Sequence, residues 1–150
     1  MVQDWESLAM VKARVGRIFF ERISEDEDLA DALKKRAEEN RIKSGFLLII
    51  GSLKKAVLGY YKEGKYYNLN LAGPLEIASG MGNIAVGEKG ETMIHAHLVV
   101  SNEKGEAFGG HLMQGSPVGA TAELVIVEGL GVNLVRALDE KTKLNLLKLG

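Results

Sequence analysis

The sequence predicts an α+β domain, in which one main helix packs on a largely antiparallel sheet of about seven strands. Three observations indicate this class. Short runs of apolar and β-branched residues recur along the chain, and most are joined by tight turns that contain glycine. One segment of roughly 16 residues has apolar residues at helical spacing. No internal repeat or low-complexity linker divides the 150 residues, so we expect a single domain over residues 1–150.

The composition narrows the classes of function. Hydrophobic residues make up 46% of the chain and charged residues 26%, which is typical of a soluble globular protein. The formal net charge of -1 gives no overall basic field to attract nucleic acid. The chain has no cysteine, which excludes disulfides and thiolate metal sites. Since there is no apolar run of membrane length and no signal-peptide pattern, we expect a cytoplasmic protein without a membrane partner.

Local patterns predict the individual elements. A first strand leads to Ser24, which with Glu27 forms a capping-box pattern and predicts a helix over residues 24–40. Leu29 and Leu33 give this helix an apolar stripe that should face a sheet. The expected strands are residues 15–23, 46–52, 56–61, 66–69, 75–86, 93–101, 106–112 and 121–127.

Glycine and proline punctuate the middle of the chain. We expect Gly73 and Pro74 to break the chain before residues 75–86, which we interpret as two short strands or one strand bent at its glycines. The tail from Leu130 onward is apolar enough to dock on the domain or to lie on a neighbour.

All three histidines of the chain lie in the strand pair over residues 93–112. Side chains on a strand alternate between its two faces, so His95 and His97 share one face. The other face carries only apolar residues and is expected to be core. That core set is Ile94, Ala96, Leu98 and Val100, joined from the second strand by Phe108 and Leu112.

The turn between these two strands sets the position of His111. Asn102 suits the first position of a type I turn, and Gly105 suits the left-handed residue of the bulge that follows it. The resulting register places His97 directly opposite His111. A bulge at the two glycines before His111 would shift this register by one residue.

Three imidazoles arranged in this way can converge on one divalent ion through metal–nitrogen bonds of about 2.0–2.1 Å. We therefore predict a metal site formed by His95, His97 and His111. The ligand type favours zinc, although imidazole also binds copper, nickel and iron. The alternatives are a hydrogen-bonded polar pocket without metal and an unrelated surface cluster.

A catalytic form of this site would keep a coordination position open for water and would use a carboxylate as general base. Glu76 and Glu123 are the candidates, because both lie on strands that we expect to neighbour the histidine hairpin. The alternative for both glutamates is a salt bridge with Arg17, Arg22 or Arg136.

Several stretches together resemble the PPC domain family, the plant and prokaryote conserved domain. They are residues 25–29, 45–51, 75–77, 82–84, 94–97, 105–112 and 122–123. The resemblance implies a compact α+β fold that assembles as a homotrimer, with the histidine hairpin near the subunit contacts. A homotrimer is also expected because one helix covers only part of such a sheet. The chain is similar to the prokaryotic, histidine-containing type, whose biochemical role the family leaves unsettled.

The family is often labelled DNA-binding, because its plant members carry AT-hook segments. The nearest approach here to the Arg-Gly-Arg-Pro core is Val15-Gly16-Arg17, which lacks the first arginine and the proline. Basic residues in the first third of the chain alternate with acidic ones, which predicts a solvated helix face. We therefore expect DNA to be at most a weak partner.

Three functions stay open at this point. They are a trimeric protein with a three-histidine divalent-metal site, a DNA-binding or regulatory protein, and a metal-dependent enzyme acting on a small molecule. A cupin barrel is a weaker alternative, since His95 and His97 with Glu103 and Gly110 loosely echo its metal motif. Glu103 falls in the turn, however, and a helix over residues 24–40 is foreign to a plain barrel.

Overall fold

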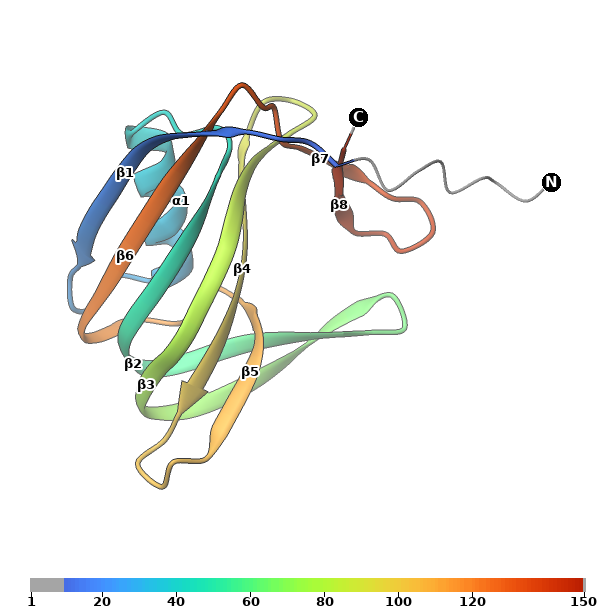
Figure 1. Cartoon of the computed structure of the whole chain (residues 1–150). Helices are drawn as coiled ribbons and strands as arrows, with labels where there is room; N and C mark the ends of the chain where they lie inside the picture. The colour runs from blue at the N-terminus through green and yellow to red at the C-terminus, as the bar shows by residue number, and fades with distance from the viewer. Residues whose placement is uncertain (1–9, 150) are drawn as a thin grey trace.

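Residues 10–149 are described by a computed structural model, in which a mixed sheet of eight strands carries one α-helix (Figure 1). The elements are β1 Arg14–Ile23, α1 Leu29–Glu39, β2 Gly45–Lys62, β3 Lys65–Gly87, β4 Thr92–Ser101, β5 Ala107–Leu112, β6 Val118–Leu130, β7 Val135–Leu138 and β8 Asn145–Lys148. This confirms the predicted α+β class. Within the described residues, no helix has the length and apolar character needed to cross a membrane.

Three expectations from the sequence stay predictions. The segment before Met10, on which the expectation about a signal peptide rests, lies outside the described residues. The cytoplasmic location and the assignment of residues 1–150 to a single domain are likewise untested.

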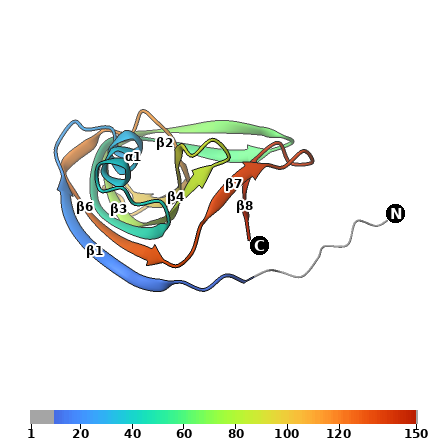
Figure 2. The same cartoon turned by 90° about the horizontal axis from the view of Figure 1, so that it is seen from above.

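The two longest strands, β2 and β3, hold the sheet together. Hydrogen-bonded neighbours follow the order β1-β6-β2-β5-β4-β3-β7-β8, and β2 pairs with β3 as well. The strands β2, β5, β4 and β3 therefore form a closed ring of pairings. Every pair is antiparallel except β3 with β7. Seen from above, the sheet curls and α1 lies within the curve (Figure 2).

The breaks expected in the middle of the chain are irregularities within continuous strands. β2 runs over 18 residues and β3 over 23, so the two strands expected at 46–52 and 56–61 are one. A register shift between Leu53 and Lys55 absorbs the bend in β2. Gly73 and Pro74 lie within β3 and do not end it. The reason is that β2 and β3 pair with each other along most of their length. The hydrogen bonds on either side of Gly73 and Pro74 therefore continue the strand through them.

The helix begins later than predicted. Its N-cap is Asp28, whose side chain accepts a hydrogen bond from the Asp31 N–H at 3.2 Å. Ser24 and Glu27 do interact, since the Ser24 N–H donates to the Glu27 carboxylate at 3.0 Å. Asp26 between them has φ 69°, however, which a right-handed helix does not allow. The capping-box pattern therefore forms a turn ahead of α1, and the prediction of a helix from Ser24 is wrong.

The core lies between α1 and the inner face of the sheet. Leu29 and Leu33 of the helix are fully buried, as their stripe predicts. Of the expected core positions of β4, Ala96, Leu98 and Val100 are buried, whereas Ile94 is half-buried. The outward face of the sheet instead exposes large apolar side chains, among them Phe20, Phe46, Leu48, Ile50, Met81 and Val99.

The apolar tail forms a hairpin that the sequence did not reveal as strands. β7 pairs in parallel with the end of β3, through Val86 and Val135, and β8 pairs with β7. This hairpin and the tip of the β2–β3 hairpin project on the same side of the molecule (Figure 1). The Tyr61 hydroxyl joins the two hairpins by donating to the Thr142 carbonyl. The tail therefore docks on its own sheet.

Candidate metal centre

The hairpin of β4 and β5 has the predicted register. His97 pairs with His111, and no bulge interrupts the two glycines before His111. The Asn102 side-chain oxygen accepts from two backbone N–H groups of the turn, each at 3.0 Å. Gly105 takes the left-handed conformation, with φ 76°. Local turn chemistry thus places His111 across from His97.

The three imidazoles converge on the outward face of this hairpin. One ring nitrogen from each of His95, His97 and His111 lies within 4.8 Å of the other two. Nε2 of His95 and Nε2 of His97 are 3.1 Å apart. The three ring centroids are separated by 5.0, 5.1 and 5.5 Å. Strand alternation and the turn register together therefore produce the triangle that the sequence predicts.

The surroundings keep two of these rings neutral. Burial lowers the pKa of His111 to about 4, and the neighbouring His95, His97 and Arg136 act in the same direction. Burial also lowers the pKa of His95, helped by Arg136 and His97. Both rings are therefore neutral at pH 7, the form in which imidazole binds a metal. Nδ1 of His111 is buried and has no hydrogen-bond partner. A buried polar atom is normally paired, and a bound ion would provide the missing partner.

Arg136 of β7 reaches the cluster from the C-terminal hairpin. Its Nη2 lies 2.8 Å from the Asn83 side-chain oxygen and 3.0 Å from Nδ1 of His95. Its Nη1 donates to the Asn145 carbonyl at 3.0 Å. A guanidinium can only donate hydrogen bonds, so Nδ1 of His95 is the acceptor. The neutral ring of His95 then carries its proton on Nε2, the nitrogen beside His97.

The cluster fits a tetrahedral ion after small movements. Bonds of about 2.0–2.1 Å at tetrahedral angles separate ligand nitrogens by roughly 3.3–3.4 Å. The 3.1 Å between His95 and His97 is close to this value. Ligation through Nε2 of His95 also requires the ring proton to move to Nδ1, and Arg136 must then give up its contact there. No Asp or Glu of the described residues belongs to the group, so three histidines would leave a position for another ligand.

The two glutamates considered as general bases do not join the cluster. Glu76 of β3 lies opposite Ser101, which is four residues along β4 from His97, or roughly 13 Å. Glu123 of β6 pairs with Ile50 of β2. β6 pairs with β1 and β2, so the expectation that Glu123 lies on a strand beside the hairpin is wrong. A general base has to be within hydrogen-bond reach of its proton, directly or through one water, and neither carboxylate is.

Two of the three arginines considered as partners of these glutamates bind other groups. Arg17 pairs with Glu128 at 2.8 Å, and Arg136 donates to the Asn83 side chain and to the Asn145 carbonyl. Among residues 10–149, neither Glu76 nor Glu123 has a salt bridge. Their side chains are exposed, so they need no such partner.

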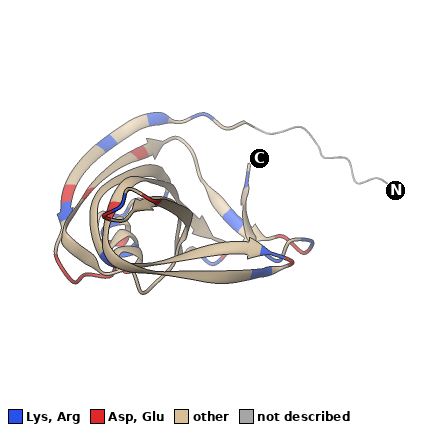
Figure 3. Cartoon of the chain, turned by 90° about the horizontal axis from the view of Figure 1, so that it is seen from below, with Lys and Arg blue, Asp and Glu red and all other residues tan. Residues whose placement is uncertain are grey.

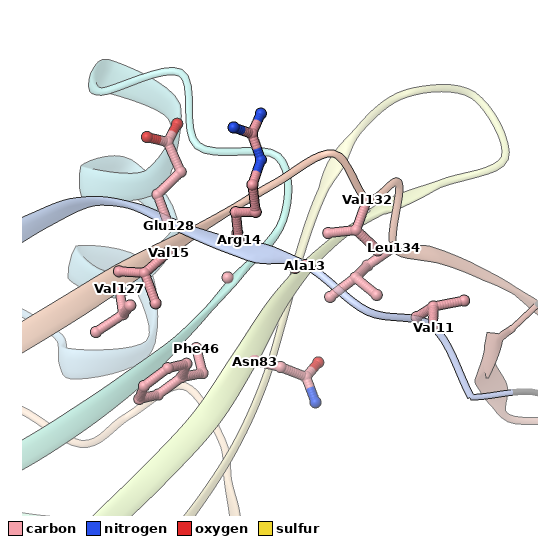
Figure 4. A pocket seen from close by; sticks show the side chains of 12 residues that line it. Val11, Ala13, Arg14, Val15, Phe46, Asn83, Val127, Glu128, Val132 and Leu134 are labelled. Carbon is pink, nitrogen blue, oxygen red and sulfur yellow. The ribbon is translucent and has the colours of Figure 1, made fainter.

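Another cavity, of about 350 Å³, opens beside the start of β1 (Figure 4). Apolar side chains such as Val15, Phe46 and Val127 line it, and no histidine does. Its one carboxylate, Glu128, is already paired with Arg17. The histidine cluster is therefore the stronger candidate for chemistry.

Sequence reasoning missed the part of the site that surrounds the histidines. Arg136 was considered only as a partner for the glutamates, and Asn83 and Tyr66 were not considered for the site. The Tyr66 ring packs against His111 with centroids 5.2 Å apart. The sequence did carry one signal for Arg136, which is the single charged residue in the apolar run Val135–Leu138. A charged residue is rarely buried without a partner, so its place in an apolar strand is informative.

Known proteins share this fold. Residues 10–129 match the Plants and Prokaryotes Conserved (PCC) domain. A metal-containing protein of Archaeoglobus fulgidus is 30% identical with a TM-score of 0.85, covering 93% of this chain and 98% of that chain. A plant- and prokaryote-conserved (PPC) protein of Pyrococcus horikoshii is 32% identical with a TM-score of 0.85, covering 93% and 97%. A protein of Ralstonia eutropha JMP134 described as a candidate DNA-binding protein is 26% identical with a TM-score of 0.78, covering 87% and 90%.

A curated relative is much longer than this chain. The bifunctional protein GlmU of Synechococcus sp. strain JA-3-3Ab is 30% identical over 127 residues, which is 84% of this chain. The matched part spans 19% of that protein, so its whole activity does not transfer to this chain. The domain match and the two archaeal structures agree with the resemblance carried by the histidine motifs, and the chain belongs to the Plants and Prokaryotes Conserved domain family.

Proposed function

We propose that this protein binds a divalent metal ion, zinc, through His95, His97 and His111. One observation carries the proposal, namely that ring nitrogens of all three histidines lie within 4.8 Å of one another. The neutral state of the His95 and His111 rings supports it, as does the related A. fulgidus protein described as metal-containing. Zinc is our choice because it takes neutral imidazole ligands in a tetrahedral arrangement.

A bound ion would supply a Lewis acid with a coordination position for an outside ligand. The three histidines would hold it. Arg136, itself bound to Asn83, orients the His95 ring before the ion binds, and the Tyr66 ring packs against His111. An enzymatic role on a small molecule would need a proton acceptor other than Glu76 or Glu123, because both lie too far from the cluster.

The test is a zinc titration of metal-stripped protein by calorimetry, with elemental analysis of the purified protein to identify its metal. We expect one zinc per chain, and loss of most of the affinity in His97→Ala and in His111→Ala. Since the ligands act as a unit, the double variant should lose little more than either single variant. Ser101→Ala is the matched control, because it alters the same face of β4 away from the cluster. Equal zinc binding in all variants, or no zinc binding by the wild type, would contradict the metal site. The cluster would then be interpreted as a hydrogen-bonded pocket without metal.

We also propose that the outward face of the sheet is the interface of a homotrimer. Its side chains are unusually exposed for their type, with 48% for Phe46, 45% for Leu48, 56% for Ile50 and 57% for Met81. A contiguous apolar patch of this kind marks an interaction surface. Met81 pairs with both Leu48 and His97, so the histidine cluster would lie beside the subunit contacts. Sedimentation equilibrium should give three times the chain mass of 16.3 kDa, and a stable monomer at micromolar concentration would contradict the assignment.

DNA binding is a second candidate because of the description of the Ralstonia protein. Basic and acidic residues are interspersed along the strands and loops (Figure 3), and the formal net charge is -1. We therefore propose only weak binding without sequence preference, with Kd of about 10⁻⁴–10⁻⁶ M at physiological salt. Fluorescence anisotropy with labelled duplexes tests this, and nanomolar, sequence-selective binding would contradict it.

A further inference from the structure

We propose that the pocket beside the histidine cluster binds a small organic carboxylate with an apolar body. The pocket has a volume of about 380 Å³ and lies between the tip of the β2–β3 hairpin and the β7–β8 hairpin. His95, His111 and Arg136 line it, together with Tyr61 and Tyr66 from one hairpin and Leu146 from the other. The inference deepens the proposed metal site and rests on it for the metal-dependent part of the affinity.

The first argument is a buried cation that lacks a counter-ion. Arg136 is only 7% exposed. Its acceptors are the Asn83 side chain, the Asn145 carbonyl and Nδ1 of His95, and all three are uncharged. Among the described residues no carboxylate pairs with Arg136, and no Asp or Glu lines the pocket. A buried charge without a partner is unfavourable, and an anion in the pocket would offset that cost.

The guanidinium also keeps donor capacity for such an anion. It has five N–H donors in a planar fork that matches a carboxylate. Nε of Arg136 is buried and has no hydrogen-bond partner. Nη1 makes one hydrogen bond and has two N–H groups. A carboxylate in the pocket would accept from the remaining Nη1 donor and would also balance the charge.

The walls of the pocket favour a ligand with an apolar body. Tyr66 is 39% exposed and Leu146 is 42% exposed, and they stand on opposite hairpins. The other charged residue of the lining, Lys143, is also basic. A volume of this size is at the low end for small-molecule sites, which indicates a compact ligand.

Metal and carboxylate should reinforce each other. Ligation of a metal by Nε2 of His95 places a proton on Nδ1, which can then no longer accept from Nη2 of Arg136. That donor becomes available to the carboxylate. The ion also adds positive charge beside the pocket, since His95 and His111 belong to both sites. By linkage, the carboxylate must then strengthen metal binding by the same factor.

The experiment compares benzoate with benzamide, its neutral isostere, by calorimetry on the full chain in zinc-loaded and metal-free form. We expect zinc-loaded protein to bind benzoate at least about tenfold more tightly than benzamide, because a hydrogen bond to a charged group contributes that much. Acetate, which lacks the apolar body, should bind more weakly than benzoate. Arg136→Gln should lose about tenfold or more of the benzoate affinity. Arg22→Gln, the same change on exposed β1, should retain it.

Each outcome decides a different point. Equal affinity for benzoate and benzamide overturns the inference, and this comparison needs no variant, so it holds even where Arg136→Gln fails to fold. Inorganic phosphate binding more tightly than benzoate overturns the assignment to a carboxylate. Zinc binding without benzoate binding removes this inference and leaves the proposed function. Arg136-dependent benzoate binding in a protein that binds no zinc removes the proposed metal site and leaves the carboxylate pocket.

Discussion

Gly110→Ala would push β5 away from β2 directly beside His111. A Cβ at this position would lie 2.9 Å from the Gly59 carbonyl oxygen and 3.1 Å from Cβ of Leu58. Backbone atoms cannot yield as a flexible side chain can, so the strands must separate. β5 meets β2 through only two residue pairs, Leu58 with Leu112 and Gly59 with His111. Separation here therefore moves His111 relative to the two histidines of β4.

The neighbouring glycine is a matched control. A Cβ on Gly109 would meet the Leu98 carbonyl oxygen at 3.3 Å and Cγ2 of Val99 at 3.6 Å. Movement by a few tenths of an ångström relieves the first contact. Gly109→Ala makes the same chemical change on the same strand and should keep the position of His111.

The expected magnitude follows from overpacking. Forcing one extra methyl into a packed site costs about 1–3 kcal/mol, and replacing glycine by alanine returns about 0.4–1 kcal/mol through the unfolded chain. Gly110→Ala should therefore lose about 1–2 kcal/mol, which lowers Tm by about 2–8 °C for a chain of this size. Gly109→Ala should change Tm little. Displacement of one ligand should also weaken zinc binding by about 10–100-fold in Gly110→Ala.

The measurements are thermal melts in chelator and a zinc competition titration against a chromophoric chelator. If the two alanine variants behave alike, the contact of Gly110 with β2 does not position His111. Wild-type zinc affinity in a destabilised Gly110→Ala would contradict the expected displacement of a His111 ligand.

Two further predictions concern pH and the helix cap. The pKa of His111 is about 4 in the folded protein and about 6.5 in the unfolded chain. Between these pH values the unfolded state binds more protons than the folded state. Metal-free protein should therefore lose stability as pH falls from about 6.5 to 4. Melts in chelator at pH 7.5 and 5 test this, and a smaller loss is expected in His111→Gln. Asp28→Ala removes the acceptor of three N–H groups, those of Asp31, Gly115 and Ser116, and should cost about 2–3 kcal/mol in urea denaturation. Asp28→Asn should retain part of that stability, and an unchanged midpoint in Asp28→Ala would contradict the role of the cap.

The histidine triangle could be predicted from sequence because its causes are local. Alternation along β4 fixes the shared face of His95 and His97, and the turn at Asn102 and Gly105 fixes the register of β5. All of this information lies within one hairpin. The stripe of α1 was predictable for the same reason, since its spacing is a property of the helix alone.

The remaining features depend on pairings between distant segments. Whether Gly73 and Pro74 end a strand depends on β2, which pairs on either side of them. The distance of Glu123 from the hairpin depends on the strand order, in which β2 lies between β6 and the hairpin strands. The start of α1 at Asp28 depends on the loop at Gly115 and Ser116, whose N–H groups bind the same carboxylate. No local pattern contains these contacts.

The two halves of the candidate site therefore have different origins. The histidines are brought together by pairing within residues 92–112, whereas Arg136 arrives only when β7 pairs with the end of β3. The domain match ends at residue 129, before this hairpin, yet the two archaeal structures cover 93% of the chain, so that likeness extends into the C-terminal segment. A change that undocks β7 should leave the three histidines in register and remove Arg136 and one wall of the pocket. Metal binding and ligand recognition are thus separable by their position in the chain, although His95 couples them.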